Sequence, residues 1–211
     1  MKKIMFNEQY GLESAVLERR KTMTRRAVVH PKRFRGHDDV VLEYHRRLGS
    51  DFYYDCVVLD ADDHELGQLP LPYEVGDVVA IAQSYCDIMD RHGDWLHKQC
   101  AANGFNADNL LYEVGWNNKM FVKADLMPHQ IRISDLWFER LQAISDDDCL
   151  KEGVHVCKDG GYWLEGPSRQ FGGVIFNTPR EAFAALIDKV SGPNTWHNNP
   201  WVVAYTFELV K

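Results

Sequence analysis

The sequence predicts an α+β fold, a small β-barrel with peripheral helices and inserted loops. Short apolar stretches of strand-like character recur from the N-terminus to the C-terminus. Only a few segments place apolar residues at helical spacing, and most of these have a capping or stop signal. The 211 residues contain no internal repeat and no flexible linker, so a single domain spanning 1–211 is the simplest interpretation.

The first part of the chain predicts strands around one helix. Residues 3–6 form a short apolar run typical of a strand, and residues 8–19 repeat apolar side chains at helical spacing. Residues 28–49 are polar, rich in His and Arg and weakly periodic, which indicates an insertion or a long loop. Residues 54–60 (YDCVVLD) favour a strand, and residues 70–85 favour a turn that leads into a buried strand.

The middle of the chain predicts one long helix and several strands. Residues 87–102 favour a helix, with Gly104 as its stop signal. Residues 111–114 and 120–122 are short strand candidates. Residues 131–141 (IRISDLWFERL) have an alternating character, which predicts a longer strand.

The last third of the chain predicts two capped helices and a closing strand. Ser145 and the acidic residues after it form a capping signature for a short helix that Gly153 stops. Thr178 begins a second helix, because a first-turn Pro and a capping-box Glu follow it. Residues 201–210 alternate, with Val203 and every second residue after it on one face, which predicts a half-buried strand.

The bulk composition excludes several classes of protein. The formal net charge of −7 argues against a protein that coats nucleic acid by bulk electrostatics. No window of eighteen apolar residues predicts a membrane span, and the N-terminus lacks the apolar core of a signal peptide. Five Cys without a CxxC pair favour free thiols in a reducing compartment, so we expect a cytoplasmic protein. The sequence leaves the oligomeric state open.

One local cluster runs against the acidic composition. Residues 18–26 (ERRKTMTRR) gather five Arg or Lys residues beside two Thr hydroxyls, at a predicted helix-to-strand junction. Like charges repel, so we expect a favourable interaction that compensates for the repulsion within this cluster. A solvated helix end is the simpler explanation, and a site for an anion or a nucleotide is the more specific one.

Weaker signals lie elsewhere. His97 and Cys100 are one helical turn apart with His92 nearby, but no second ligand pair is visible, so neither a metal nor a cofactor is predicted. Several aromatic residues are candidates for base stacking or, more simply, for the core: Trp137, Phe138, Trp163, Trp196 and Trp201. Asn199 precedes the last strand, where it suits either a base edge or a turn.

Four motifs in order resemble a known family: RRKTMTRR, YEVGDVVAIAQSY, RISDLWFERLQAISDDDCLKEGV and NPWVVAYTFELV. Together they resemble the ASCH-domain family, in the elaborated form common in bacteria and their phages. The resemblance covers most of the chain and leaves 28–55, 86–109 and 157–172 as apparent insertions. It implies a PUA-like β-barrel that binds RNA or a nucleotide.

The resemblance also suggests site residues. A short member of the family is an amidohydrolase that acts on acylated cytidine nucleosides such as N4-acetylcytidine, and another member is a metal-dependent ribonuclease. The catalytic Lys, Thr and Glu of the amidohydrolase match Lys21, Thr24 and Glu152, although this chain is much longer than that enzyme. The neighbouring polar residues are candidate ligand contacts: Arg20, Thr22, Arg25, Arg26 and Asn199.

The chemistry of these residues is self-consistent. Lys21 can take a proton from the Thr24 hydroxyl only if burial or the neighbouring Arg residues lower the pKa of its ammonium. Glu152 is expected in the last turn of its helix, where the dipole disfavours a carboxylate and so suits it to acid–base work. A third possibility, a phage or accessory module that binds another protein, predicts that these three residues lie far apart.

Overall fold

The computed structural model describes residues 1–158, 160–166 and 174–210 and confirms the α+β class. The main sheet contains eight strands: β1 (Lys3–Ile4), β2 (Met23–Ala27), β5 (Val41–Arg46), β6 (Tyr53–Leu59), β7 (Glu65–Gln68), β8 (Val78–Ile81), β9 (Gln130–Arg140) and β12 (Trp201–Leu209). Two small hairpins pair β3 (Arg33–Phe34) with β4 (His37–Asp38) and β10 (His155–Val156) with β11 (Tyr162–Trp163).

The helices lie around this sheet. The α-helices are α1 (Leu12–Leu17), α2 (Tyr85–Ala102), α3 (Asp146–Lys151), α4 (Pro179–Ser191) and α5 (Thr195–Asn198). The 3₁₀ helices are η1 (Glu8–Tyr10), η2 (Ala107–Tyr112), η3 (Val114–Trp116), η4 (Lys119–Phe121), η5 (Ala124–Leu126) and η6 (Leu141–Ala143). Within the described residues no helix is both long and apolar enough to cross a membrane.

The sheet is not a closed barrel, which corrects the sequence-based expectation. Its main path runs β1-β8-β9-β12-β2, and no pairing between β1 and β2 closes it among the described residues. β1 pairs with β8 over only two residues before the chain enters η1. The long strand β9 pairs with β8 near one end and meets β6 at the other, where Tyr53 lies opposite Phe138. The sheet therefore branches instead of closing.

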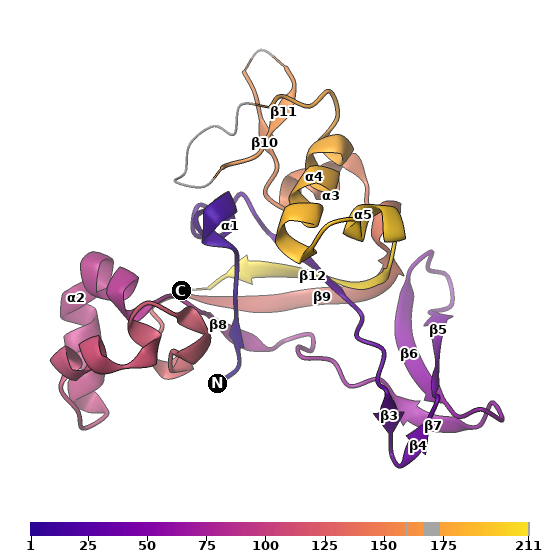
Figure 1. The fold of residues 1–211 in the computed structure, drawn as a ribbon, viewed down its shortest axis with the longest axis horizontal. Coiled ribbons are helices and arrows are strands. Elements are labelled where there is room, and N and C mark those ends of the chain that lie inside the picture. Colours follow the sequence, from indigo (N-terminus) through magenta and orange to yellow (C-terminus); the bar gives the residue numbers. More distant parts are fainter. Residues whose placement is uncertain (159, 167–173, 211) are drawn as a thin grey trace.

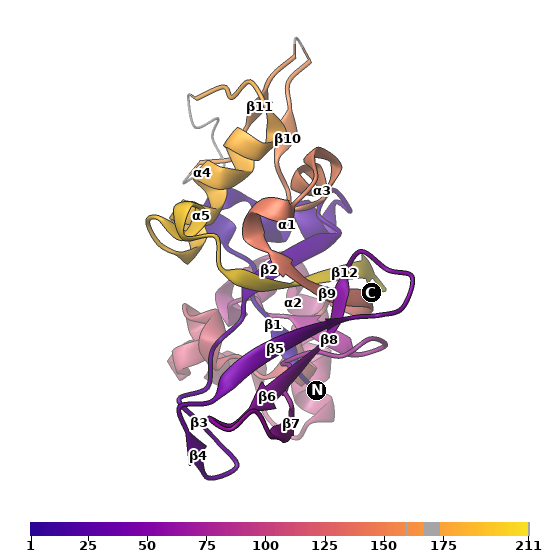
Figure 2. The same ribbon diagram turned by 90° about the vertical axis from the view of Figure 1, so that its right-hand side faces the viewer.

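Three arms extend from the central strands (Figure 1). The upper arm holds α3, α4, α5 and the β10–β11 hairpin, the α2 arm holds α2 and η2 to η5, and the hairpin arm holds β3 to β7. Figure 2 shows the upper arm and β5 to β7 at opposite ends of the molecule, with β9 and β12 between them. The hairpin arm continues the sheet where Tyr53 of β6 pairs with Phe138 of β9, and Tyr44 of β5 also stacks on Trp201 of β12 with ring centroids 3.9 Å apart.

Two further expectations need correction. Residues 28–49 are not a long loop, because they contain the β3–β4 hairpin and β5, and the alternative of an insertion stays a prediction. Residues 111–114 and 120–122 do not form strands, because 3₁₀ turns occupy this region. The side chains of Asn106 and Asn118 accept hydrogen bonds from backbone N–H groups two residues ahead and start the η2 and η4 turns.

The predicted helix-capping signals in the second half of the chain are confirmed. Ser145 caps α3 by accepting from the Asp148 N–H, and Thr178 and Glu181 form the expected capping box of α4. β12 is less exposed than expected, because both of its faces are buried over residues 202–205, where it lies between β9 and β2. Of the expected insertion at 157–172, residues 159 and 167–172 lie outside the described residues. The single-domain assignment stays a prediction.

Candidate functional site

The basic cluster occupies a helix-to-strand junction, as expected. α1 ends at Leu17 and β2 begins at Met23. The backbone N–H of Thr22 donates to the Lys151 carbonyl at 3.0 Å, and the Thr22 carbonyl accepts from the Phe207 N–H at 2.9 Å. These bonds fix the start of β2 against the end of α3 and against β12. Residues from three distant parts of the sequence therefore meet at this point.

Lys21 and Glu152 form a buried ion pair. Lys21 Nζ donates to Glu152 Oε2 at 2.6 Å and to the Glu152 carbonyl at 2.8 Å. Lys21 is only 2% exposed and Glu152 only 4%. Glu152 is the C-cap residue of α3, so the helix end supplies both the carbonyl and the carboxylate that hold the ammonium.

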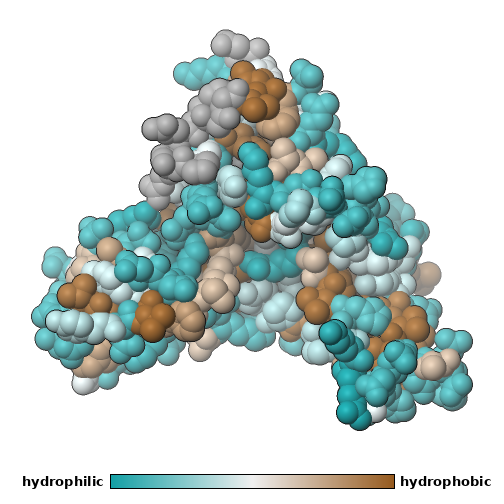
Figure 3. Space-filling model, in the orientation of Figure 1, coloured by the Kyte–Doolittle hydropathy of each residue, from teal (hydrophilic) through white to brown (hydrophobic). Residues whose placement is uncertain are grey.

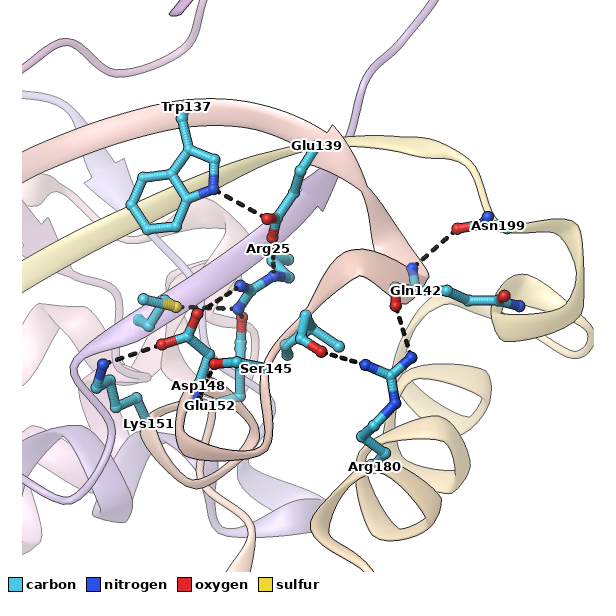
Figure 4. Close-up of polar contacts among 12 residues, drawn as sticks. Arg25, Trp137, Glu139, Gln142, Ser145, Asp148, Lys151, Glu152, Arg180 and Asn199 are labelled. Carbon is cyan, nitrogen blue, oxygen red and sulfur yellow. Dashed lines mark hydrogen bonds and ion pairs between the residues drawn. The ribbon is translucent and has the colours of Figure 1, made fainter. Parts of the chain in front are cut away.

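Arg25 forms a second buried cationic centre, surrounded by the carboxylates of Glu139, Asp148 and Glu152 (Figure 4). Its Nε donates to Glu139 Oε1 at 2.6 Å, and its two terminal nitrogens lie 3.2 Å from Glu152 Oε1 and from Asp148 Oδ2. Glu139 also accepts from the indole N–H of Trp137 at 3.0 Å. The two oxygens of Glu152 are thus divided between Lys21 and Arg25, and the Arg25 side chain is completely buried.

Burial and charge shift the acid–base properties of both cations. Burial lowers the pKa of Lys21, and the nearby Arg26 and Arg25 lower it further against the opposing attraction of Glu152. Burial would also lower the pKa of Arg25, but the Glu152 and Glu139 carboxylates outweigh it and raise that pKa. Arg25 is therefore a permanent charge that neutralises carboxylates, whereas Lys21 is the cation that gives up its proton more readily.

A cavity of about 260 Å³ opens over the Lys21–Glu152 pair. Polar residues line one side, among them Thr24 and Arg26 of β2, and apolar residues of α4 line the other, among them Phe183 and Leu186. In a strand alternate side chains share a face, so Thr24 and Arg26 point to the same side of β2. Figure 3 shows the molecular surface hollowed where the three arms meet.

The structure brings the three predicted catalytic residues together. Lys21, Thr24 and Glu152 line one cavity, and Arg25 and Arg26 line it too. The wide separation that a protein-interaction module would predict is not observed. Of the remaining predicted ligand contacts, Arg20 is paired with Glu18 at 2.7 Å and lies outside the lining.

Two further candidates have structural roles. Thr22 makes the backbone bonds described above and does not line the cavity. The Asn199 side chain accepts from the Gln142 N–H at 2.8 Å, so it fixes the turn before β12, which is the simpler of its two interpretations. Trp137 is buried, and Trp201 packs against Tyr44, so neither presents an open ring face for a base.

Sequence reasoning missed the carboxylates around Arg25. Glu139 lies two residues after Trp137 on β9, and this spacing alone places both on one face of the strand. Asp148 lies in the acidic first turn of α3, where it looks like a dipole contact only. Their common partner is more than a hundred residues away, so no local pattern indicates the network.

One cluster has the composition of a metal site. Asp60, Asp62 and His64 bring one ligand atom each to within 4.8 Å of one another, the only such group found in the described part of the chain. The Asp60 side chain accepts from the Asp62 and His64 N–H groups, so the cluster is also a tight polar turn. None of the three residues lines the cavity over Lys21.

Comparison with known proteins identified no relative. No family model matches the chain, and no significant match occurs among the curated proteins or among the solved structures.

Proposed function

We propose that the protein binds a nucleoside or nucleotide in the cavity over Lys21, Thr24 and Glu152. The observation that carries this proposal is the buried Lys21 ammonium at the side of an open cavity, beside a Thr hydroxyl and the Arg26 guanidinium. A titratable group whose pKa is shifted by burial and by specific charged neighbours, and which lines a cleft, is a candidate ligand contact. The resemblance to ASCH domains, with their PUA-like fold, supports the same ligand class.

The two sides of the cavity suit the two faces of such a ligand. Lys21 and Arg26 donate hydrogen bonds, and Thr24 both donates and accepts, which matches the carbonyl and amine edge of a nucleobase. The flat face of the base would pack against apolar residues of α4, such as Phe183 and Leu186. Sites of this kind combine an apolar wall with a few orienting polar groups.

Titration calorimetry with cytidine and N4-acetylcytidine tests the proposal. We expect Thr24→Val to weaken binding about two- to tenfold, because it keeps the shape of the side chain and removes one hydrogen bond worth about 0.5–1.5 kcal/mol. The matched control is Thr206→Val, the same change on β12 at a residue that bonds to Ser134 and does not line the cavity. Absence of binding to nucleosides and short RNAs at low salt would refute the proposal.

The same geometry favours a second candidate, an amidohydrolase. Its support is specific: Lys21 has a lowered pKa and shares the cavity with Thr24 and Glu152. The Thr24 hydroxyl would attack the acyl carbon of an acylated exocyclic amine while Lys21 takes its proton. Glu152, which accepts from the Lys21 ammonium, would relay that proton to the leaving amine, Arg26 would stabilise the oxyanion, and water would then hydrolyse the ester on Thr24 and regenerate its hydroxyl.

Chromatography of N4-acetylcytidine incubated with the protein distinguishes the two candidates. Hydrolysis releases cytidine and acetate, and we expect Thr24→Val to abolish it while Thr206→Val leaves it unchanged. The rate should rise with pH until Lys21 is deprotonated, at a pH below the ordinary 10.5 of Lys. Binding without turnover in the unmodified protein would leave the binding function alone.

A further inference from the structure

A second cavity adjoins the first. Its volume is about 320 Å³, and it shares Arg26 and Ala27 of β2 with the cavity over Lys21. Val203 and Tyr205 of β12 lie opposite Arg26 and Thr24 in the sheet, so the two cavities follow one face of the same strand pair. The far wall of the second cavity is apolar and is formed by residues 69–72.

Arg26 stands at the boundary with its charge unopposed. Arg25 is matched by three carboxylates, but no ion pair forms at Arg26 within the described residues. One terminal nitrogen of Arg26 donates to the Met5 carbonyl at 2.9 Å, and its buried Nε–H has no hydrogen-bond partner. A buried donor left without a partner is costly, and an acceptor bound at this guanidinium would relieve that cost.

The charge of Arg26 shifts the pKa of one group in each cavity. In the first cavity burial lowers the pKa of Lys21, and Arg26 adds to that effect. In the second cavity burial raises the pKa of Tyr205, and Arg26 opposes the rise. A guanidinium in this position favours an anion between the two cavities.

We propose that the ligand is a dinucleotide unit, with one nucleoside in each cavity and the connecting phosphodiester on Arg26. This inference rests on the proposed function and extends it from a nucleoside to a strand. The first cavity alone is below the roughly 300–1,000 Å³ of typical small-molecule sites, whereas the two together lie within that range. The apolar wall at residues 69–72 offers a flat surface to the second base.

The test compares four probes by calorimetry: cytidine, its 5′- and 3′-monophosphates, and the dinucleotide of two cytidines. We expect the dinucleotide to bind at least about tenfold more tightly than cytidine, because a hydrogen bond to a charged group adds about that factor. Because salt screens a contact between one phosphate and Arg26, the affinity for the dinucleotide should fall as salt rises, whereas the affinity for uncharged cytidine should stay nearly constant. The monophosphates separate the contribution of the phosphate from that of the second nucleoside.

Two variants locate the effect. Arg26→Gln should remove the salt dependence and bring the dinucleotide close to cytidine, and Arg26→Lys should keep the salt dependence. Val29→Glu places a negative charge at the exposed edge of the second cavity, so it should weaken the dinucleotide and leave cytidine unchanged. Val114→Glu is its matched control, at an exposed residue of η3 that lines neither cavity.

The outcomes separate the two proposals. Equal binding of cytidine and the dinucleotide, or an unchanged ratio between them in Arg26→Gln, overturns the dinucleotide inference and leaves the nucleoside site standing. Tight binding of a monophosphate that equals the dinucleotide assigns Arg26 to a terminal phosphate and overturns the role of the second cavity. Failure of every probe to bind overturns both proposals.

Discussion

Lys21 relies on Glu152 for neutralisation of its charge more than Glu152 relies on Lys21. Glu152 contacts two cations, Lys21 through Oε2 and Arg25 through Oε1. Lys21 contacts one carboxylate, that of Glu152, among the described residues. Removal of one member of a buried ion pair is strongly destabilising when it leaves the other charge uncompensated. The same pair is therefore more sensitive to loss of the carboxylate than to loss of the ammonium.

This asymmetry predicts how substitutions at Lys21 and Glu152 change the stability of the protein. Alanine substitutions at Lys21 or Glu152 are not silent in the fold, because both residues are buried. Glu152→Gln should lower the free energy of unfolding by about 3–5 kcal/mol, since it leaves the buried Lys21 ammonium without a carboxylate partner. Lys21→Met should have a smaller effect, because Arg25 still neutralises Glu152. The double variant should recover part of the Glu152→Gln loss in urea denaturation.

The pH dependence of this loss has a definite sign. Burial lowers the pKa of Lys21 below the ordinary 10.5 that it regains on unfolding. The unfolded chain therefore binds more protons through the window below 10.5, and stability from this group rises with pH there. The deficit of Glu152→Gln should accordingly shrink in alkaline solution as Lys21 loses its proton. A deficit that is equal at pH 7 and pH 10, or a larger loss in Lys21→Met, would contradict the asymmetry.

At the scale of elements, the sequence predicts well where the signal is local. The capping residues Ser145 and Thr178 mark the starts of α3 and α4, because a cap is an interaction between residues three positions apart. The helix-to-strand junction around Lys21 was found because β-branched residues interrupt an amphipathic repeat. Lys21, Thr24 and Glu152 were selected from the family resemblance, and the geometry then brought them into one cavity.

Elements whose stability comes from distant partners were missed. β5 looks like polar loop because its exposed residues obscure the alternation, yet it pairs along β6, and Tyr44 stacks on Trp201. Tertiary contacts of this kind override weak local propensity. The prediction of a closed barrel was wrong for a related reason. The number of strands does not determine whether a short edge strand such as β1 pairs with β2. Long-range pairing decides both cases.

At the scale of the whole molecule, one buried carboxylate connects α1 to the α2 arm. Glu13 of α1 is 2% exposed and accepts from Gln83 Nε2 at 2.9 Å. Its other oxygen lies 3.4 Å from Lys119 Nζ of η4, and Arg91 of α2 lies 3.8 Å away. Burial and the neighbouring Glu8 raise the pKa of Glu13 to about 7, from an ordinary value of 4.5. This contact titrates near neutral pH.

A half-buried group in the upper arm, His155, has the opposite effect to Glu13 on the pH dependence of stability. Burial, aided by Arg20, lowers the pKa of His155 to about 4 from an ordinary 6.5. Between pH 6.5 and 4 the unfolded His155 binds the proton that the folded one refuses, so stability from His155 falls as pH falls. Glu13 has the reverse sign: the folded carboxyl holds a proton that the unfolded one releases between pH 4.5 and 7. The stability profile of the unmodified protein therefore hides both effects.

Comparison of Glu13→Gln with the unmodified protein reveals the Glu13 contribution, because His155 cancels in the difference. Gln is neutral at every pH, so the two proteins should have similar free energies of unfolding at pH 4.5. The variant should become the more stable one as pH rises through 7, by up to about 3 kcal/mol. Asp77→Asn is a control of opposite sign at a carboxylate outside the Glu8–Glu13 cluster, because the hydrogen bond from Lys2 lowers the pKa of Asp77. A difference between Glu13→Gln and the unmodified protein that stays constant from pH 4.5 to 8 would contradict the raised pKa of Glu13, because the folded and unfolded carboxyls would then titrate alike.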